Sequence, residues 1–177
     1  RSTFERRRTN SEKNAKMIVL ALAIVILLFG FVVFRGAPYL PTMRRQIDDA
    51  FELLDLQPGQ TLLELGSGDG RVLAAAAKRG IYSVGYELNP LLVFWTKLRY
   101  FKHRKFITVR LGDFWQAQWP ESDAMFVFLL DRYMAKLDKK IEIYRAGKSY
   151  KLISFSFEIP GKKIDRSKKG IFLYYYR

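Results

Sequence analysis

The residues most suited to binding or chemistry lie in the stretch LLELGSGDGR, residues 62–71. Three of the five residues that directly follow a short apolar run are glycines. The turn consists of Gly66, Ser67, Gly68, Asp69 and Gly70. A glycine turn that leaves a strand and opens a helix exposes backbone N–H groups and the helix dipole to a ligand. The spacing matches neither the dinucleotide fingerprint nor a P-loop. The alternative is a structural tight turn with solvated acids.

Acidic and aromatic residues recur where neighbouring strands are expected to end. Glu64 stands just before the glycine turn, and Glu87 closes the next strand-like segment. An acid in the position of Glu87 accepts hydrogen bonds from a ribose diol in open α/β sheets. The segment GDFW then places Asp113 and Phe114 beside a flat heterocycle. Two acids, a glycine turn and a ribose carboxylate suit a cationic ligand with an adenosine part, so S-adenosylmethionine fits and a polyphosphate does not.

Strand-like and helix-like segments alternate along the part of the chain that must position these residues. The expected strands are residues 61–65, 82–87, 106–111, 124–130, 151–157 and 171–176, and the expected helices are residues 42–55, 71–79, 89–102 and 132–145. Such alternation predicts βαβ units and a mainly parallel sheet covered on both faces. Residues 158–170 show no helical crossover, so the last strand should run antiparallel beside the fifth. We therefore expect an α/β, Rossmann-like sheet of about six strands.

The long helix expected at residues 89–102 carries an apolar stripe formed by Leu91, Trp95, Leu98 and Phe101. The basic end of this helix holds His103, the only histidine of the chain. A solvated partner of the helix dipole is the simplest interpretation of that residue.

Composition limits the class of protein and of partner. The chain has 177 residues, no cysteine, and 31 Lys and Arg against 17 Asp and Glu, for a net charge of +14. The absence of cysteine excludes thiolate metal sites and disulfides, and we predict no metal site. A strongly basic balance favours anionic partners, meaning nucleic acid or acidic lipid.

Residues 17–34, MIVLALAIVILLFGFVVF, contain no charged side chain. As a helix they would span about 27 Å, close to the ~30 Å hydrocarbon core of a bilayer. We expect a single transmembrane helix here, which makes the lipid bilayer a partner. The expected organisation is a basic tail at 1–16, this helix at 17–34, a linker and amphipathic helix at 35–58, and a ligand-binding domain at 59–177.

The charges flanking residues 17–34 do not decide the orientation of the chain, because basic residues lie on both sides of the segment. S-adenosylmethionine is available in the cytosol and in the mitochondrial matrix, so we expect the ligand-binding domain on the cytosolic or mitochondrial matrix face of the membrane.

The stretch ELGSGDGRVLAAAAKRGIYSVGYELNPLL resembles the class I methyltransferases. More closely, the chain is similar to the membrane-anchored mitochondrial protein-lysine methyltransferases that act on the ATP synthase c subunit or the adenine nucleotide translocase, and to their prokaryotic relatives. The segments PYLPT, GYELNP, GDFW and FEIPGK match those of the family, with Glu158 and Lys162 departing from its usual Pro and Trp. The resemblance implies that S-adenosylmethionine is the cofactor and that the substrate is a lysine of a membrane or membrane-near protein.

The resemblance also implies roles for individual residues. Glu64 and the glycine turn would hold the methionine part of the cofactor, with Thr42 closing over it. Glu87 would bind the ribose, and Asp113 and Phe114 would flank the adenine. The reaction would be in-line methyl transfer to a neutral amine, which requires alignment and the exclusion of water.

Asp131 follows the fourth expected strand and is the best-placed acid to orient or deprotonate the lysine amine, which makes it the candidate catalytic residue. The alternative for Asp131 is a helix N-cap. Two other functions stay open. An RNA or small-molecule methyltransferase would exploit the positive charge, although the chain lacks an NPPY-type motif. A non-catalytic, membrane-tethered binding module would use the fold only to bind a partner.

Overall fold

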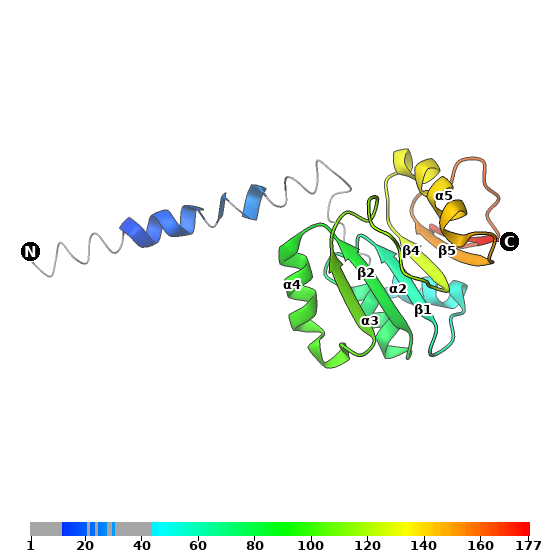
Figure 1. The fold of residues 1–177 in the computed structure, drawn as a ribbon, viewed down its shortest axis with the longest axis horizontal. Coiled ribbons are helices and arrows are strands. Elements are labelled where there is room, and N and C mark those ends of the chain that lie inside the picture. The colour runs from blue at the N-terminus through cyan, green and yellow to red at the C-terminus, as the bar shows by residue number, and fades with distance from the viewer. Residues whose placement is uncertain (1–11, 21, 24, 28–29, 31–43) are drawn as a thin grey trace, which may run out of the picture. The chain divides into compact units, whose positions relative to one another are not determined.

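The computed structural model describes residues 12–20, 22–23, 25–27, 30 and 44–177 (Figure 1). The chain separates into two compact units, Arg1–Pro38 and Tyr39–Arg177. All described residues of the first unit are helical. No helix among the described residues is long and apolar enough to cross a membrane. The predicted membrane helix at 17–34 falls partly outside these residues, and the predicted linker with Thr42 lies entirely outside them.

A seven-stranded sheet in the order β3-β2-β1-β4-β5-β7-β6 forms the centre of the second unit (Figure 1). Its strands are β1 Thr61–Leu65, β2 Tyr82–Glu87, β3 Ile107–Leu111, β4 Ala124–Val127, β5 Tyr150–Phe155, β6 Arg166–Lys168 and β7 Ile171–Tyr176. The first five are parallel, and β7 runs antiparallel beside β5. The expected α/β class and the reversed last strand are confirmed.

The prediction of about six strands was wrong by one strand. The additional strand, β6, has three residues and pairs only with β7. Its sequence, Arg-Ser-Lys, carries no apolar side chain; β6 is the last strand of the sheet, and its Lys168 forms ion pairs with Asp49 and Glu52 of helix α2, Arg44–Leu54. Without an apolar pattern, no sequence signal separated β6 from the loop around it.

Helices cover both faces of the sheet. They are α2 Arg44–Leu54, α3 Arg71–Lys78, α4 Pro90–Arg99 and α5 Asp131–Arg145, with a short 3-10 helix, η1, at Phe101–His103. Alternate residues of each strand point to opposite faces. Leu62 of β1 therefore packs in the core with α2 and α3, whereas Leu63 packs in the core with α5. The central strands β1 and β4 are buried on both faces, as expected for parallel strands covered by helices on both sides.

Helix α4 begins at a cap that the sequence encodes directly. Asn89 is the N-cap, and its side-chain oxygen accepts a hydrogen bond from Leu91 N at 2.9 Å. Pro90 occupies the first helical position, where its missing N–H costs no hydrogen bond. The helix ends at Arg99, and η1 continues the chain, so the single helix expected over residues 89–102 is divided in two.

Candidate functional site

The glycine turn lies between the carboxyl end of β1 and the first residue of α3. Gly66 N and Ser67 N both donate to the carbonyl oxygen of Tyr86 on β2, at 2.9 and 2.8 Å. Gly66, Gly68 and Gly70 have φ values of 82°, 53° and 75°, a left-handed conformation that L side chains rarely adopt. The turn is therefore fixed against β2, with Gly70 as the N-cap of α3.

Glu87 connects the glycine turn to the next strand and helix. One oxygen of its carboxylate accepts a hydrogen bond from Gly68 N at 2.8 Å, and the other accepts one from Asn89 N at 2.8 Å. Burial raises the pKa of Glu87, and these backbone hydrogen bonds partly oppose that rise. Each carboxylate oxygen has a second lone pair, so Glu87 retains the capacity to accept hydrogen bonds from a diol.

Three buried polar atoms near the turn have no hydrogen-bond partner among the described residues. They are Glu64 Oε2, Ser67 Oγ and Asn89 Nδ2. An unsatisfied buried polar group costs about 1–3 kcal/mol, so native proteins rarely keep one without a reason. The three residues belong to β1, the glycine turn and the residues after β2. All three therefore lie where the parallel strands end, which we call the carboxyl edge of the sheet. This set fits a polar ligand that supplies the missing partners.

The carboxyl group of Glu64 is held in an environment that disfavours a negative charge. Burial raises the pKa of Glu64 well above its ordinary value, and the negative charges of Asp69 and Glu87 add to the effect. A cation placed against Glu64 would reverse this balance, because an opposite charge stabilises the ionised carboxylate. Glu64 is therefore suited to a cationic group.

Asp69 differs from Glu64 because it already has a charged partner. Arg71 donates through Nε and Nη2 to the two carboxylate oxygens of Asp69, at 2.9 and 2.7 Å. Burial by itself would raise the pKa of Asp69, but the hydrogen bonds and charge of Arg71 outweigh it and hold the pKa below its usual value. This ion pair stabilises the turn and leaves Glu64 as the acid that needs a ligand.

Asp113 and Phe114 follow the end of β3, in the turn where the sequence placed them. Gly112 N donates to the Glu87 carbonyl oxygen at 3.0 Å, so the turn after β3 starts beside the end of β2. Asp113 Oδ1 accepts a hydrogen bond from Trp115 N at 2.8 Å. The ring of Phe114 is half-buried, with its centroid 4.9 Å from that of Trp115. One carboxylate and one aromatic ring are thus presented at the same edge as the glycine turn.

Lys140 of α5 fixes the turn after β3, a role that the sequence did not indicate. Its Nζ donates to the carbonyl oxygens of Phe114, Trp115 and Ala117 at 2.9, 2.6 and 3.3 Å. Desolvation lowers the pKa of Lys140. Trp119 Nε1 also donates to the Phe114 carbonyl oxygen, at 2.9 Å. The position of Phe114 therefore depends on α5, on the far side of the sheet from α3.

Asp131 is not the N-cap of α5, so that alternative for its role was wrong. The cap is Leu130, and Asp131 is the first helical residue, exposed to solvent. Its Oδ1 accepts a hydrogen bond from Arg132 N at 2.7 Å. Because α5 follows β4, Asp131 lies at the same edge of the sheet as the glycine turn. No three His, Asp or Glu side chains in the described part of the chain are grouped to hold a metal.

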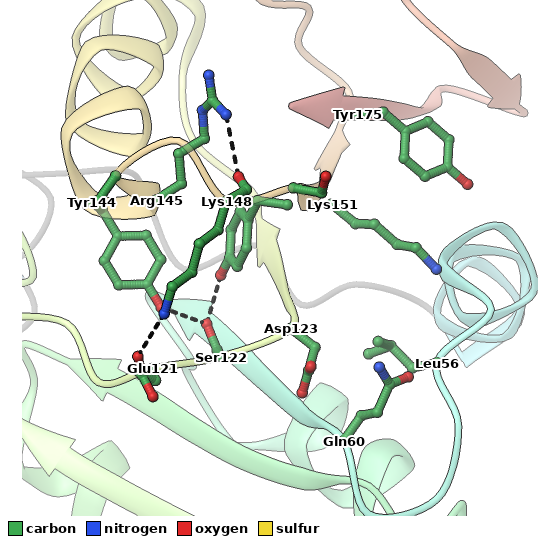
Figure 2. Close-up of a pocket in the computed structure, with 13 residues that line it drawn as sticks. Leu56, Gln60, Glu121, Ser122, Asp123, Tyr144, Arg145, Lys148, Lys151 and Tyr175 are labelled. Atoms are coloured by element: carbon green, nitrogen blue, oxygen red, sulfur yellow. Dashed lines mark hydrogen bonds and ion pairs between the residues drawn. The ribbon is translucent and has the colours of Figure 1, made fainter. Parts of the chain in front are cut away.

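A pocket of about 650 Å³ lies at the opposite edge of the sheet (Figure 2). It is lined by residues at the starts of β4 and β5 and near the end of α5. Ser122 Oγ shares hydrogen bonds with the hydroxyls of Tyr144 and Tyr150, at 2.9 and 2.6 Å. Ligands of open α/β sheets bind outside the carboxyl ends of the strands. The pocket has the opposite location, and its tyrosine hydroxyls already have partners.

A protein family shares the sequence that builds this geometry. The chain matches the ANTKMT methyltransferase domain over residues 64–166, more than half of its length. The chain belongs to this family. The methyltransferase resemblance carried by the glycine turn and by GYELNP is therefore confirmed.

Relatives with named activities are also similar to this chain. The Homo sapiens lysine N-methyltransferase of the ATP synthase c subunit is 34% identical over 107 residues, covering 59% of this chain and 46% of the human protein. Its Rattus norvegicus counterpart is 31% identical over 125 residues, covering 70% and 57%. Adenine nucleotide translocase lysine N-methyltransferase from Mus musculus is 32% identical over 115 residues, covering 59% and 47%. The chain spans about half the length of these relatives.

Solved structures confirm the class I methyltransferase fold. An RNA methyltransferase from Salinibacter ruber, in complex with S-adenosyl-L-homocysteine, superposes with a TM-score of 0.68 at 26% identity, covering 77% of this chain and 92% of that one. A dimethyladenosine transferase from Plasmodium falciparum gives a TM-score of 0.58 at 16% identity, covering 66% and 43%. The second likeness concerns the fold alone.

Thr96 and Gly85 position the glycine turn, although the sequence pattern assigned neither of them a role. Thr96 Oγ1 donates to the Gly68 carbonyl oxygen at 3.3 Å. A Cβ at Gly70 would lie 2.3 Å from Thr96 Cγ2, so only a glycine allows α4 to approach the turn this closely. The sequence shows only that Thr96 is a polar, β-branched residue within an expected helix. It does not indicate the contact with Gly68, because the two residues are 28 positions apart.

We predict that Gly85→Ala displaces the turn and lowers the free energy of unfolding by about 1–3 kcal/mol through overpacking. The added Cβ would lie 2.6 Å from Ser67 Cβ, 2.7 Å from Ser67 Oγ and 2.8 Å from Leu73 Cδ1. Urea unfolding of the full chain measures the loss. The second substitution Ser67→Gly removes two of these three contacts and should restore part of the stability. Equal losses in the single and double variants would contradict the assigned contact.

Proposed function

We propose that this chain is an S-adenosylmethionine-dependent methyltransferase that methylates a lysine side chain of a membrane or membrane-near protein. The observation that carries the proposal is the set of buried, unpartnered polar atoms of Glu64, Ser67 and Asn89 beside the glycine turn. Membership of the ANTKMT methyltransferase domain family supports the reaction class. The similar lysine methyltransferases named above support lysine as the acceptor.

The residues present fit the cofactor. Glu64, with its raised pKa, would face the ammonium group of the methionine part, and the glycine turn would pack against that part of the cofactor. Glu87 would accept hydrogen bonds from the ribose hydroxyls. Asp113 and Phe114 would lie against the adenine, held in place by Lys140 through the Phe114 carbonyl oxygen. Thr42, outside the described residues, remains a proposed closing residue.

When bound, the cofactor supplies a methyl group on a sulfonium centre. The chain must hold a lysine nitrogen in line with that group and keep water from the reacting atoms. The amine must also lose its proton, and a nearby carboxylate can accept or orient that proton. We assign this role to Asp131, whose exposed carboxylate lies at the site edge of the sheet.

RNA methylation is the second candidate function. The net charge of +14 suits a phosphate backbone, and the Salinibacter ruber protein with the same fold is named an RNA methyltransferase. A lysine acceptor remains the favoured proposal because the similar proteins with named substrates and 31–34% identity are lysine methyltransferases.

Radiolabelled S-adenosylmethionine distinguishes these functions. The full chain, incubated with the labelled cofactor and with membranes that lack this protein, should transfer label to a protein band that yields methyl-lysine on hydrolysis. Glu87→Gln should weaken cofactor binding by about 1–3 kcal/mol in calorimetry, because the ribose would lose charged acceptors. Ser122→Ala, at the opposite edge of the sheet, is the matched control and should keep full transfer. Label on RNA would instead favour the second candidate, and no transfer would contradict both.

Binding of S-adenosylhomocysteine, which keeps the α-ammonium group but cannot transfer methyl, should depend on pH through Glu64. The raised pKa leaves Glu64 protonated in the free protein at a pH where an ordinary glutamate is ionised. A cationic ligand favours the carboxylate, so binding should release a proton and tighten as the pH rises toward that raised pKa. Calorimetry in buffers of different ionisation enthalpy measures the proton. Glu64→Gln should abolish the release, and an unchanged release would refute the assignment.

We also propose that residues 17–34 anchor the chain in a membrane, with the catalytic domain on the cytosolic or mitochondrial matrix face. The uninterrupted apolar sequence of this segment supports the anchor. The supply of the cofactor supports the orientation. The full chain should resist extraction from membranes by alkaline carbonate and dissolve in detergent. Release by carbonate alone would rule out the anchor.

A further inference from the structure

The outward face of α4 carries the large apolar side chains that a surface helix normally buries. Among its residues only Val93 and Thr96 are buried. Phe94 and Leu98 are 67% and 62% exposed, and Phe101 in η1 is 60% exposed. Together with Leu91 and Trp95, these residues follow the i, i+3, i+4, i+7 spacing of one helical stripe. We call Leu91, Phe94, Trp95, Leu98 and Phe101 the α4 face.

The packing of α4 explains why this stripe faces outward. The inner side of the helix must approach the glycine turn closely, and Thr96 makes that contact with Gly68 and Gly70. Val93 adds a small core contact with Leu73 and Val109. The bulky apolar stripe lies on the opposite side of α4 and cannot join this core without moving the glycine turn. A contiguous exposed apolar stripe of this kind marks an interaction surface rather than a packing defect.

The charges around the α4 face indicate the chemistry of its partner. No acidic residue occurs between Glu87 and Asp113, whereas this segment contains Lys97, Arg99, Lys102, Arg104, Lys105 and Arg110. The Arg104 guanidinium lies 4.4 Å from the Phe101 ring centroid, and that of Arg99 lies 6.0 Å from the Trp95 ring centroid. Apolar and cationic groups are thus interleaved on one surface.

We infer that the α4 face is a membrane-binding surface that inserts its apolar side chains at the boundary between head groups and acyl chains of an anionic bilayer. Helices that lie in this boundary combine an aromatic and aliphatic face with flanking Lys and Arg, and basic residues near the surface are attracted to anionic lipid. A second copy of the chain is a poorer occupant, because stacking two α4 faces would oppose their basic residues without an acidic partner.

Contact through the α4 face would orient the candidate site with respect to the bilayer. Helix α4 begins at Pro90, three residues after Glu87. The backbone N–H of its N-cap, Asn89, donates a hydrogen bond to the Glu87 carboxylate. The carboxyl edge of the sheet is therefore rigidly connected to the helix that would touch the lipid. The α4 face is distinct from the proposed anchor at 17–34, since it is a folded surface of the second unit.

The absence of cysteine allows one nitroxide label to be placed at a chosen residue of the full chain. Leu98→Cys puts the label on the α4 face, and Ile143→Cys, at an 81% exposed apolar position on α5, is the matched control. Each labelled chain is mixed with vesicles of phosphatidylcholine alone or with added phosphatidylglycerol. Electron paramagnetic resonance then measures accessibility to oxygen, which concentrates in acyl chains, and to a water-soluble nickel complex.

With anionic vesicles, we expect the label at 98 to become several-fold more accessible to oxygen and several-fold less accessible to nickel, while the label at 143 stays aqueous. Replacing Lys97, Lys102 and Arg104 by Gln should reduce this change. Identical behaviour of the two labels would overturn the inference. Protection of the label at 98 from both reagents would also overturn it, because that result indicates a protein partner or a second copy. Equal insertion into phosphatidylcholine alone would refute the role of the basic residues. The readout does not depend on methyl transfer.

Discussion

The hydrogen bonds of the Glu87 carboxylate connect the elements on which the candidate site depends. Gly68 N–H and Asn89 N–H point at its two oxygens, so one side chain fixes the glycine turn after β1 and the start of α4. A carboxylate that accepts backbone hydrogen bonds can remain ionised while buried. Because these bonds leave lone pairs free, the same group that organises the turn can also accept a ligand's hydroxyl groups.

The three acids near the glycine turn differ in burial and in the partners of their carboxylates. Asp69 is neutralised by Arg71, and Glu87 is hydrogen-bonded to the backbone. Glu64 has neither kind of partner for Oε2, and burial raises its pKa. The acid that is least satisfied in the protein alone is therefore the one best suited to a cationic ligand. The free-energy cost of burying this carboxyl group without a partner would be offset when a cationic ligand binds.

The two faces of the sheet support the site by different means. Helices α2, α3 and α4 lie on one face, whereas α5 is the only long helix packed against the other among the described residues. No helix lies between β3 and β4 in this described part of the chain. The aromatic side chains of Trp115 and Trp119 and the three hydrogen bonds of Lys140 hold that connection in place instead. A loop that would contact the adenine is thereby made part of the core.

The sequence by itself determined the elements and most of the candidate site, because these depend on local patterns. Alternating apolar segments predicted the parallel sheet, and the glycine spacing with Glu64, Glu87 and Asp113 predicted which strand ends would meet. Tertiary structure alone decided three features. The strand β6 has no apolar residue and exists only by pairing with β7. The contacts of Thr96 and Lys140 join residues that are distant in sequence. The apolar stripe of α4 was visible in the sequence, but its outward direction was not, because the contact between Thr96 and the glycine turn decides which side of the helix meets the sheet.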